Sequence, residues 1–178
     1  MQKVRVLLAL LFGMAVLFGC EPPADPDLSP DERKAISYLA KKKYKIIERL
    51  GERSRYVLER EMLSQLYYSN IWAVQRTPPE PYIGKTIVTY GFIVTNHPLE
   101  KLYSVIWEKD EFDVEVIVML SEGQVIGGTS FPVLKSGDLL VGAPYSLDGK
   151  DLTEITGMSY GEWLEAWKAR YGDAGEQP

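Results

Sequence analysis

The stretch Ile87-Val88-Thr89-Tyr90-Gly91-Phe92-Ile93-Val94-Thr95 decides the fold class of this chain. It is rich in β-branched and aromatic residues, a composition typical of a β-strand. Successive side chains of a strand point to opposite faces, so one face carries Val88, Tyr90, Phe92 and Val94. The sequence therefore predicts a strand with one strongly apolar face.

The residues that follow predict a hairpin beside this strand. Val114 to Leu120 forms one arm, Glu122-Gly123 the turn, and Gln124 to Gly128 the other arm. Both arms are apolar on both faces, which indicates a central place in a sheet. Leu147-Asp148-Gly149-Lys150 predicts a further turn.

A helix is predicted where the domain begins. Ser29 is placed to cap this helix, Pro30 occupies its first position, and Glu32 has the spacing of a capping box. Alanine, isoleucine and leucine then recur at helical spacing as far as residue 40. We expect the helix to end near Lys43.

The next segment is expected to alternate between strand and helix. Residues 44–47 predict a first strand, residues 51–54 a turn, and residues 55–58 the returning strand of a hairpin. A second helix is expected over residues 61–68, with Met62, Leu63 and Leu66 facing inward. Three prolines make residues 76–81 a loop.

Near the C-terminus, Ser159-Tyr160-Gly161-Glu162 repeats the capping-box pattern. It predicts a last helix, stopped by Gly172, with Trp163, Leu164 and Trp167 facing inward. Residues 157–161 also match the G-x-S-x-G pattern of a nucleophile elbow, but that motif needs a buried strand before it and a histidine after it. Neither is found around Ser159, so we assign this serine to the helix cap.

Together these elements predict a single α+β domain, with a mainly antiparallel sheet and helices packed on one side.

The N-terminus has the organisation of a secretory signal. A basic start from Met1 to Arg5 precedes an unbroken apolar run from Val6 to Phe18. These 13 residues would form a helix of roughly 20 Å, shorter than the roughly 30 Å hydrocarbon core of a bilayer. We therefore predict a cleaved signal over residues 1–19. An uncleaved anchor helix is the alternative.

Leu17-Phe18-Gly19-Cys20 resembles a lipobox, the recognition site for bacterial lipoprotein processing, although Phe18 departs from the usual smaller residue. The resemblance implies diacylglycerol on the Cys20 thiol, cleavage before Cys20, and a place on the extracytoplasmic face of the cell membrane. Cys20 is the only cysteine, so the mature domain can form no internal disulfide.

The expected organisation is a lipidated cysteine with a flexible Pro- and Asp-rich tether over residues 20–29, a domain over residues 30–172, and a disordered tail over residues 173–178. Without the signal the chain keeps 18 basic and 25 acidic residues, a net charge of −7. This balance argues against nucleic acid as a partner. The expected partners are the membrane, through the lipid on Cys20, and a protein of the cell envelope.

The stretch from Tyr82 to Gly128 resembles an uncharacterised family of small secreted or lipid-anchored proteins of Gram-positive bacteria. The matching segments are residues 82–85, 90–98 and 123–128, with 36–39 and 44–46 as the family's opening helix and strand. Residues 151–171 depart from the compact form of the family and form an extension. The family has no assigned activity, so the resemblance implies fold and location only.

Four residues are candidates for contact with a ligand or partner, namely His97, Gly127, Gly128 and Tyr145. His97 is the only histidine, and the favoured interpretation is a structural turn residue before Pro98. Two adjacent glycines within a strand indicate local geometry or a ligand passing over bare backbone. Tyr145 belongs to an excess of aromatic residues of the kind that suits binding surfaces. A shared concave pocket would favour small-molecule binding, and scattered positions would leave protein contact as the default.

No catalytic residue, cofactor or metal site is predicted. One histidine with scattered carboxylates does not make a zinc site. The acidic segment from Glu108 to Asp113 lacks the glycine and the spacing of a calcium loop. The sequence thus predicts a non-catalytic binding or protein-interaction module. A carboxylate-dependent envelope hydrolase and an accessory ectodomain of a membrane protein are the alternatives.

Overall fold

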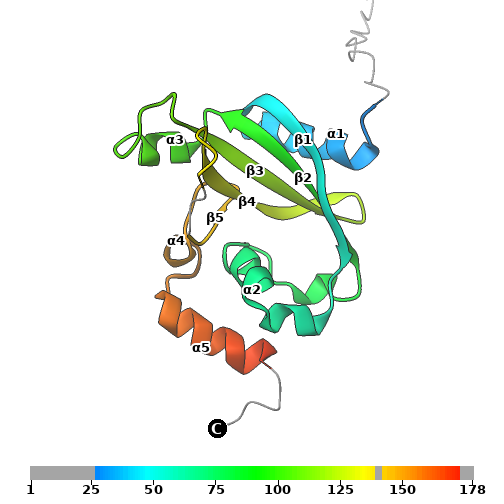
Figure 1. The fold of residues 1–178 in the computed structure, drawn as a ribbon. Coiled ribbons are helices and arrows are strands. Elements are labelled where there is room, and N and C mark those ends of the chain that lie inside the picture. Colours follow the sequence, from blue (N-terminus) through cyan, green and yellow to red (C-terminus); the bar gives the residue numbers. More distant parts are fainter. Residues whose placement is uncertain (1–26, 139–141, 173–178) are drawn as a thin grey trace, which may run out of the picture.

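A five-stranded antiparallel sheet forms the centre of the molecule (Figure 1), in a computed structural model that describes residues 27–138 and 142–172. Each strand pairs with the next one along the chain. The strands are β1 (Lys45–Val57), β2 (Thr86–Thr95), β3 (Phe112–Ser121), β4 (Gln124–Leu134) and β5 (Tyr145–Ser146). The expected single α+β domain with a mainly antiparallel sheet is confirmed.

The signal, Cys20 and the tail from residue 173 lie outside the described residues. In the part of the chain that the structure describes, no helix combines the length and the apolar character needed to cross a membrane.

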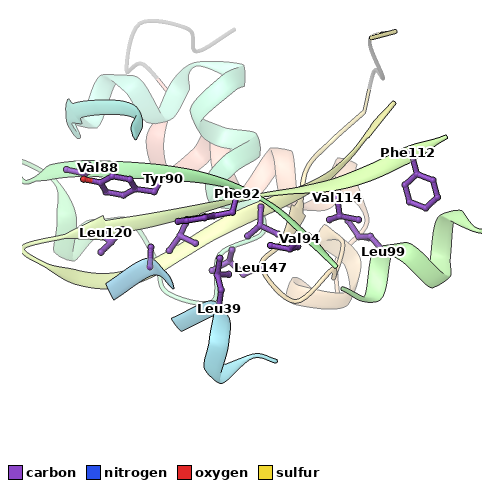
Figure 2. Packing of buried hydrophobic residues seen from close by; sticks show 13 residues of the cluster. Leu39, Val88, Tyr90, Phe92, Val94, Leu99, Phe112, Val114, Leu120 and Leu147 are labelled. Carbon is purple, nitrogen blue, oxygen red and sulfur yellow. The ribbon is translucent and has the colours of Figure 1, made fainter. Parts of the chain in front are cut away.

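The apolar face predicted for β2 is buried as expected. Its alternate residues pack with those of β3 in one cluster, which contains Val88, Tyr90, Phe92, Val94, Val114, Val116, Val118 and Leu120 (Figure 2). Helix α1 (Pro30–Lys41) covers this cluster through Ala35 and Leu39, both fully buried. Burial of a leucine side chain such as that of Leu39 contributes about 1.5–3 kcal/mol. We call this side of the sheet the α1 face.

The opposite side of the sheet carries helices as well, which corrects the expectation that all helices pack on one side. The 3₁₀ helix η1 (Arg60–Ser64) and helix α2 (Leu66–Ala73) pack against Ile87 of β2 and Met119 of β3 through Leu63 and Trp72. The reason is that β2 and β3 have apolar residues on both faces, and each face must be shielded from water. We call this side the α2 face.

Four further helices complete the fold of the described residues. They are η2 (Glu80–Tyr82), α3 (Pro98–Tyr103), α4 (Leu152–Thr156) and α5 (Tyr160–Tyr171). Leu99 of α3 joins the cluster on the α1 face. Helix α5 packs on η1, where Trp167 Nε1 donates a hydrogen bond of 2.7 Å to the Leu63 carbonyl oxygen.

Strand β1 differs from the hairpin expected over residues 44–58. It is one continuous strand, paired with β2 along its length and interrupted by three shifts of register. One shift falls at Gly51, whose φ of +72° is the left-handed geometry that suggested a turn. The glycine forms a bulge instead, which bends and twists the strand without ending it.

The helix boundaries follow their capping residues. The Ser29 side chain accepts a hydrogen bond of 3.0 Å from the Glu32 backbone N–H, as predicted, and Ser159 forms the predicted capping box with Glu162. The Glu32 carboxylate faces Arg49 at 3.7 Å, so the box expected at the first helix is not formed. The second helix was expected over residues 61–68, but extended backbone at Gln65 divides that region into η1 and α2.

Candidate functional site

The side chain of Gln75, a residue that follows α2, covers the backbone of Gly127 and Gly128. The Gln75 Oε1 atom accepts a hydrogen bond of 2.8 Å from the Gly128 N–H, and its Nε2 atom donates to the Gly128 carbonyl oxygen at 3.1 Å. A Cβ atom on Gly127 would lie 2.1 Å from Gln75 Oε1. The group that lies over this bare backbone is therefore the Gln75 side chain of the same protein. Close packing within the protein explains why glycines are found at these positions.

His97 is a buried structural residue, with 3 % of its surface exposed. Its Nδ1 atom accepts a hydrogen bond of 3.2 Å from the Leu99 N–H and caps α3. The proton of the neutral ring must then lie on Nε2, which donates to the Leu147 carbonyl oxygen at 3.2 Å. The Tyr44 hydroxyl donates to the same oxygen at 3.0 Å. His97 thus joins α3 to the turn after β5.

The stability of the fold should depend on pH through His97. Burial lowers the pKa of His97 from 6.5 to about 4. Below pH 6.5 the unfolded chain binds a proton at this histidine, whereas the folded chain does not. The contribution of neutral His97 to the free energy of unfolding is therefore complete above pH 6.5 and is lost as the pH falls toward 4. Between pH 7.5 and 4.5 the loss should reach about 2.5 kcal/mol.

Urea unfolding of wild type and His97→Asn at both pH values measures this effect. Asparagine can still cap α3 but does not titrate, so the stability difference between the two proteins should shrink at pH 4.5. A difference that stays constant with pH would show that the histidine does not titrate as the structure requires.

Tyr145 belongs to an aromatic group beside β5. Its hydroxyl oxygen lies 3.0 Å from that of Tyr103, whose ring stacks on Trp107 with 5.2 Å between the ring centres. Burial, with a smaller contribution from the bond to Tyr145, raises the pKa of Tyr103 to about 12. The rings of Tyr103 and Tyr145 border a cavity of about 510 Å³ together with Tyr160.

The four residues singled out in the sequence do not meet in one pocket. Gly127 and Gly128 border a smaller cavity of about 230 Å³ beside Leu147. Tyr145 borders the cavity near Trp107, and His97 borders neither. By the criterion set out above, these positions alone would leave protein contact as the default.

The other motifs considered in the sequence have structural roles. Ser159, the centre of the G-x-S-x-G match, caps α5, and its hydroxyl donates to the Glu162 carboxylate at 2.8 Å. In the acidic segment, Glu111 accepts a hydrogen bond from the Glu108 N–H. Within residues 27–138 and 142–172, no group of three or more His, Cys, Asp or Glu side chains is arranged to hold a metal ion.

A cavity of about 510 Å³ lies on the α2 face and is the best candidate for a functional site. The sheet curves over α2 (Figure 1), and residues of η1, α2 and α5 pack with Ile87 and Met119 in one cluster. We call this cavity the hollow. It is lined by Arg53, Ser54, Tyr56, Thr89, Glu115, Ile117, Met119, Thr129, Ser130, Phe131 and Val133 from the strands, by Tyr67, Asn70 and Ile71 from α2, and by Gly142 and Pro144.

One ion pair lies among the largely apolar walls of the hollow. Arg53 Nη2 is 3.2 Å from Glu115 Oε1. The arginine side chain crosses β2 at Gly91, where a Cβ atom would lie only 2.9 Å from Arg53 Cγ. The missing side chain at Gly91 therefore lets Arg53 of β1 reach Glu115 of β3 across the strand between them. Glu115 is the single carboxylate among the described residues that line the hollow.

The hollow also offers polar groups that have no partner in the described part of the chain. The side chains of Asn70 and Thr129 form no hydrogen bond among the described residues, whereas Ser54 and Thr89 bond to each other at 2.8 Å. Burial raises the pKa of Tyr56, which keeps its hydroxyl protonated. A few convergent polar groups in an apolar concavity of this size are characteristic of small-molecule sites.

A second exposed apolar feature lies at the end of α3. Leu102, Val105 and Ile106 are exposed, and Val105 presents 83 % of its surface to solvent. Backbone bonds from the N–H groups of Ile106 and Trp107 to the Tyr103 carbonyl oxygen hold this segment, which we call the α3 loop. Contiguous exposed apolar side chains mark surfaces of contact with other molecules.

The hollow was missed in the sequence because its residues come from four strands and a helix. Gly91, within the stretch that predicted β2, was the one available signal, since glycine inside a strand marks a close approach of another group. Its partner, Arg53, could not be identified while residues 51–54 were interpreted as a turn.

No protein-family model, no curated protein and no solved structure matches this chain. The resemblance of residues 82–128 to an uncharacterised family of lipid-anchored proteins therefore stays a prediction.

Proposed function

We propose that this protein is a lipid-anchored, non-catalytic binding module of the cell envelope, and that its ligand enters the hollow. Diacylglycerol on Cys20 would hold it at the extracytoplasmic face of the membrane. The observation that carries the proposal is the hollow itself, an apolar concavity of about 510 Å³ that contains an ion pair. Its Asn70 and Thr129 side chains have no hydrogen-bond partner among residues 27–138 and 142–172. Its volume falls within the range of roughly 300–1,000 Å³ that is usual for ligand pockets.

The chemistry of the hollow supports binding rather than catalysis. A hydrolase that works with two carboxylates needs both beside the scissile bond. Among the residues that the structure describes, Glu115 is the single carboxylate lining the hollow, and it is paired with Arg53. His97 is not among the lining residues, and its two ring nitrogens are bonded to backbone groups. The hydrolase alternative has no comparable support.

The proposal predicts that Ile117→Gln weakens binding of an apolar probe, 1-decanol. Ile117 lies on the α2 face of β3 and lines the hollow. Losing the burial of one such side chain against a ligand removes about 1.5–3 kcal/mol, so the Kd should rise about tenfold or more. Isothermal titration calorimetry on the mature chain, with Cys20→Ser to leave it unlipidated, measures this.

Val105→Gln is the matched control, because it makes the same kind of change at the exposed α3 loop. It should leave the affinity for 1-decanol unchanged. An absence of decanol binding, or a loss caused by Val105→Gln alone, would refute the hollow as the binding site.

The α3 loop favours a second candidate function, contact with another envelope protein. Leu102, Val105 and Ile106 form an apolar surface on an ordered segment, which suits the accessory-ectodomain alternative. The two functions are compatible, since the loop and the hollow are built from different residues.

A further inference from the structure

The ion pair in the hollow presents its positive member to the solvent. The Arg53 side chain is 47 % exposed, whereas that of Glu115 is 16 % exposed. Glu115 lies between Ile93 and Phe131 on the neighbouring strands, and its Oε1 atom is fully buried. A molecule entering the hollow therefore meets the guanidinium of Arg53 before it meets the carboxylate.

The guanidinium retains capacity for hydrogen bonds. It carries five N–H donors, and none of them forms a hydrogen bond among the described residues, since the 3.2 Å contact with Glu115 Oε1 is an ion pair in which that oxygen has no hydrogen-bond partner. Arginine offers these donors in a planar fork that matches a carboxylate with two parallel bonds. The ion pair with Glu115 keeps the guanidinium within the lining of the hollow, which reduces the ordering that a ligand would have to impose.

The walls around this charge are apolar. Ile117 and Met119 continue along β3 away from Glu115, and Phe131 and Val133 lie on β4. These walls would be covered by a ligand with an aliphatic body. Arg53 is the only basic residue that lines the hollow in the described part of the chain.

We propose that the ligand of the hollow is a linear aliphatic carboxylate, with its head group on Arg53 and its chain along Ile117, Met119 and Phe131. This inference rests on the proposed function and specifies the chemical class of its ligand. A cationic amphiphile would fit the hollow poorly. The exposed charge that it would meet is the guanidinium of Arg53, and the Oε1 atom of Glu115 is buried.

Three ligands with the same ten-carbon chain test this specificity, namely decanoate, 1-decanol and decylammonium at pH 7.5. Titration calorimetry on the mature Cys20→Ser chain should give decanoate the lowest Kd, about tenfold or more below that of 1-decanol, because charge-assisted hydrogen bonds are the stronger ones. Decylammonium should bind more weakly than 1-decanol.

Arg53→Gln should remove the preference for decanoate, so that the ratio of the 1-decanol Kd to the decanoate Kd falls from about tenfold to about one. Because this variant leaves Glu115 buried without its partner, the double variant Arg53→Gln/Glu115→Gln provides the same test without an unpaired charge. Arg53→Lys should restore part of the preference. Arg55→Gln is the matched control, since Arg55 is on the same strand and pairs with Glu52 outside the hollow.

The outcomes separate the two proposals. If none of the three compounds binds, the proposed function itself fails. If 1-decanol binds but decanoate binds no better, or if decylammonium binds best, the hollow remains a binding site and the carboxylate specificity is overturned. A decanoate preference that survives in both Arg53→Gln variants also overturns it.

Discussion

A Gly128→Ala variant is expected to lose more than about 3 kcal/mol of folding stability. A Cβ atom there would lie 2.1 Å from the Ile117 carbonyl oxygen, a backbone atom of the central strand β3. The φ of +151° at Gly128 is also a conformation that side chains other than glycine rarely adopt. Neither conflict can be relieved by rotation of a side chain, so the β3–β4 pairing must be displaced.

Urea unfolding followed by circular dichroism measures this loss. Gly161→Ala is the matched control, because Gly161 lies inside α5 with nothing within 4 Å of the added Cβ atom. Alanine is the better helix former, so the control should be neutral or gain up to about 1 kcal/mol. A Gly128→Ala protein within about 1 kcal/mol of wild type would contradict the geometry assigned to the glycine pair.

The second large effect concerns the membrane anchor. Cys20→Ala should abolish incorporation of labelled palmitate into the protein in a bacterial host, because the thiol that would receive diacylglycerol is the only one in the chain. Stable anchoring needs more than one acyl chain, so loss of the modification would remove the attachment entirely. Gel fluorography of the labelled cells, with the N-terminal mass of the purified protein, measures the change.

Phe18→Ala is the matched control for Cys20→Ala. It keeps the cysteine and replaces the residue that departs from the lipobox with a smaller one, so labelling should be retained. A purified wild-type protein that begins at Met1 with a free thiol would contradict the anchor and the envelope location derived from it.

The fold class could be predicted because its signals are local. The alternation of Val88, Tyr90, Phe92 and Val94 defines the buried face of β2. Glu122 and Gly123, both with positive φ, form the turn that the sequence indicated between β3 and β4. The capping box of Ser159 and Glu162 sets the start of α5. Each of these patterns lies within ten residues of chain.

What could not be predicted depends on partners that are distant in sequence. Gly51 looks like a turn glycine until β2 is placed alongside it, where it forms a bulge. Gly127 and Gly128 look open to a ligand until Gln75, 53 residues from Gly128, is found bonded there. The distribution of helices over both faces likewise follows from tertiary packing.

The candidate site was missed for the same reason. The ion pair in the hollow joins Arg53 and Glu115, which are on strands that are not neighbours, across the gap left by Gly91. The residues that the sequence singled out, His97 and Tyr145 among them, instead hold α3 and β5 in position. In this fold, the single histidine and the aromatic residue Tyr145 therefore serve packing between elements.

The central claim is that the hollow on the α2 face receives the ligand. Its most direct test is an NMR titration of the mature Cys20→Ser chain with 1-decanol, observing methyl groups. The methyl resonances of Ile117, Met119 and Val133 should shift and reach saturation, while those of Val105 and Ile106 in the α3 loop should stay unchanged. Shifts confined to the α3 loop, or no saturable shift at the three residues of the hollow, would contradict the claim.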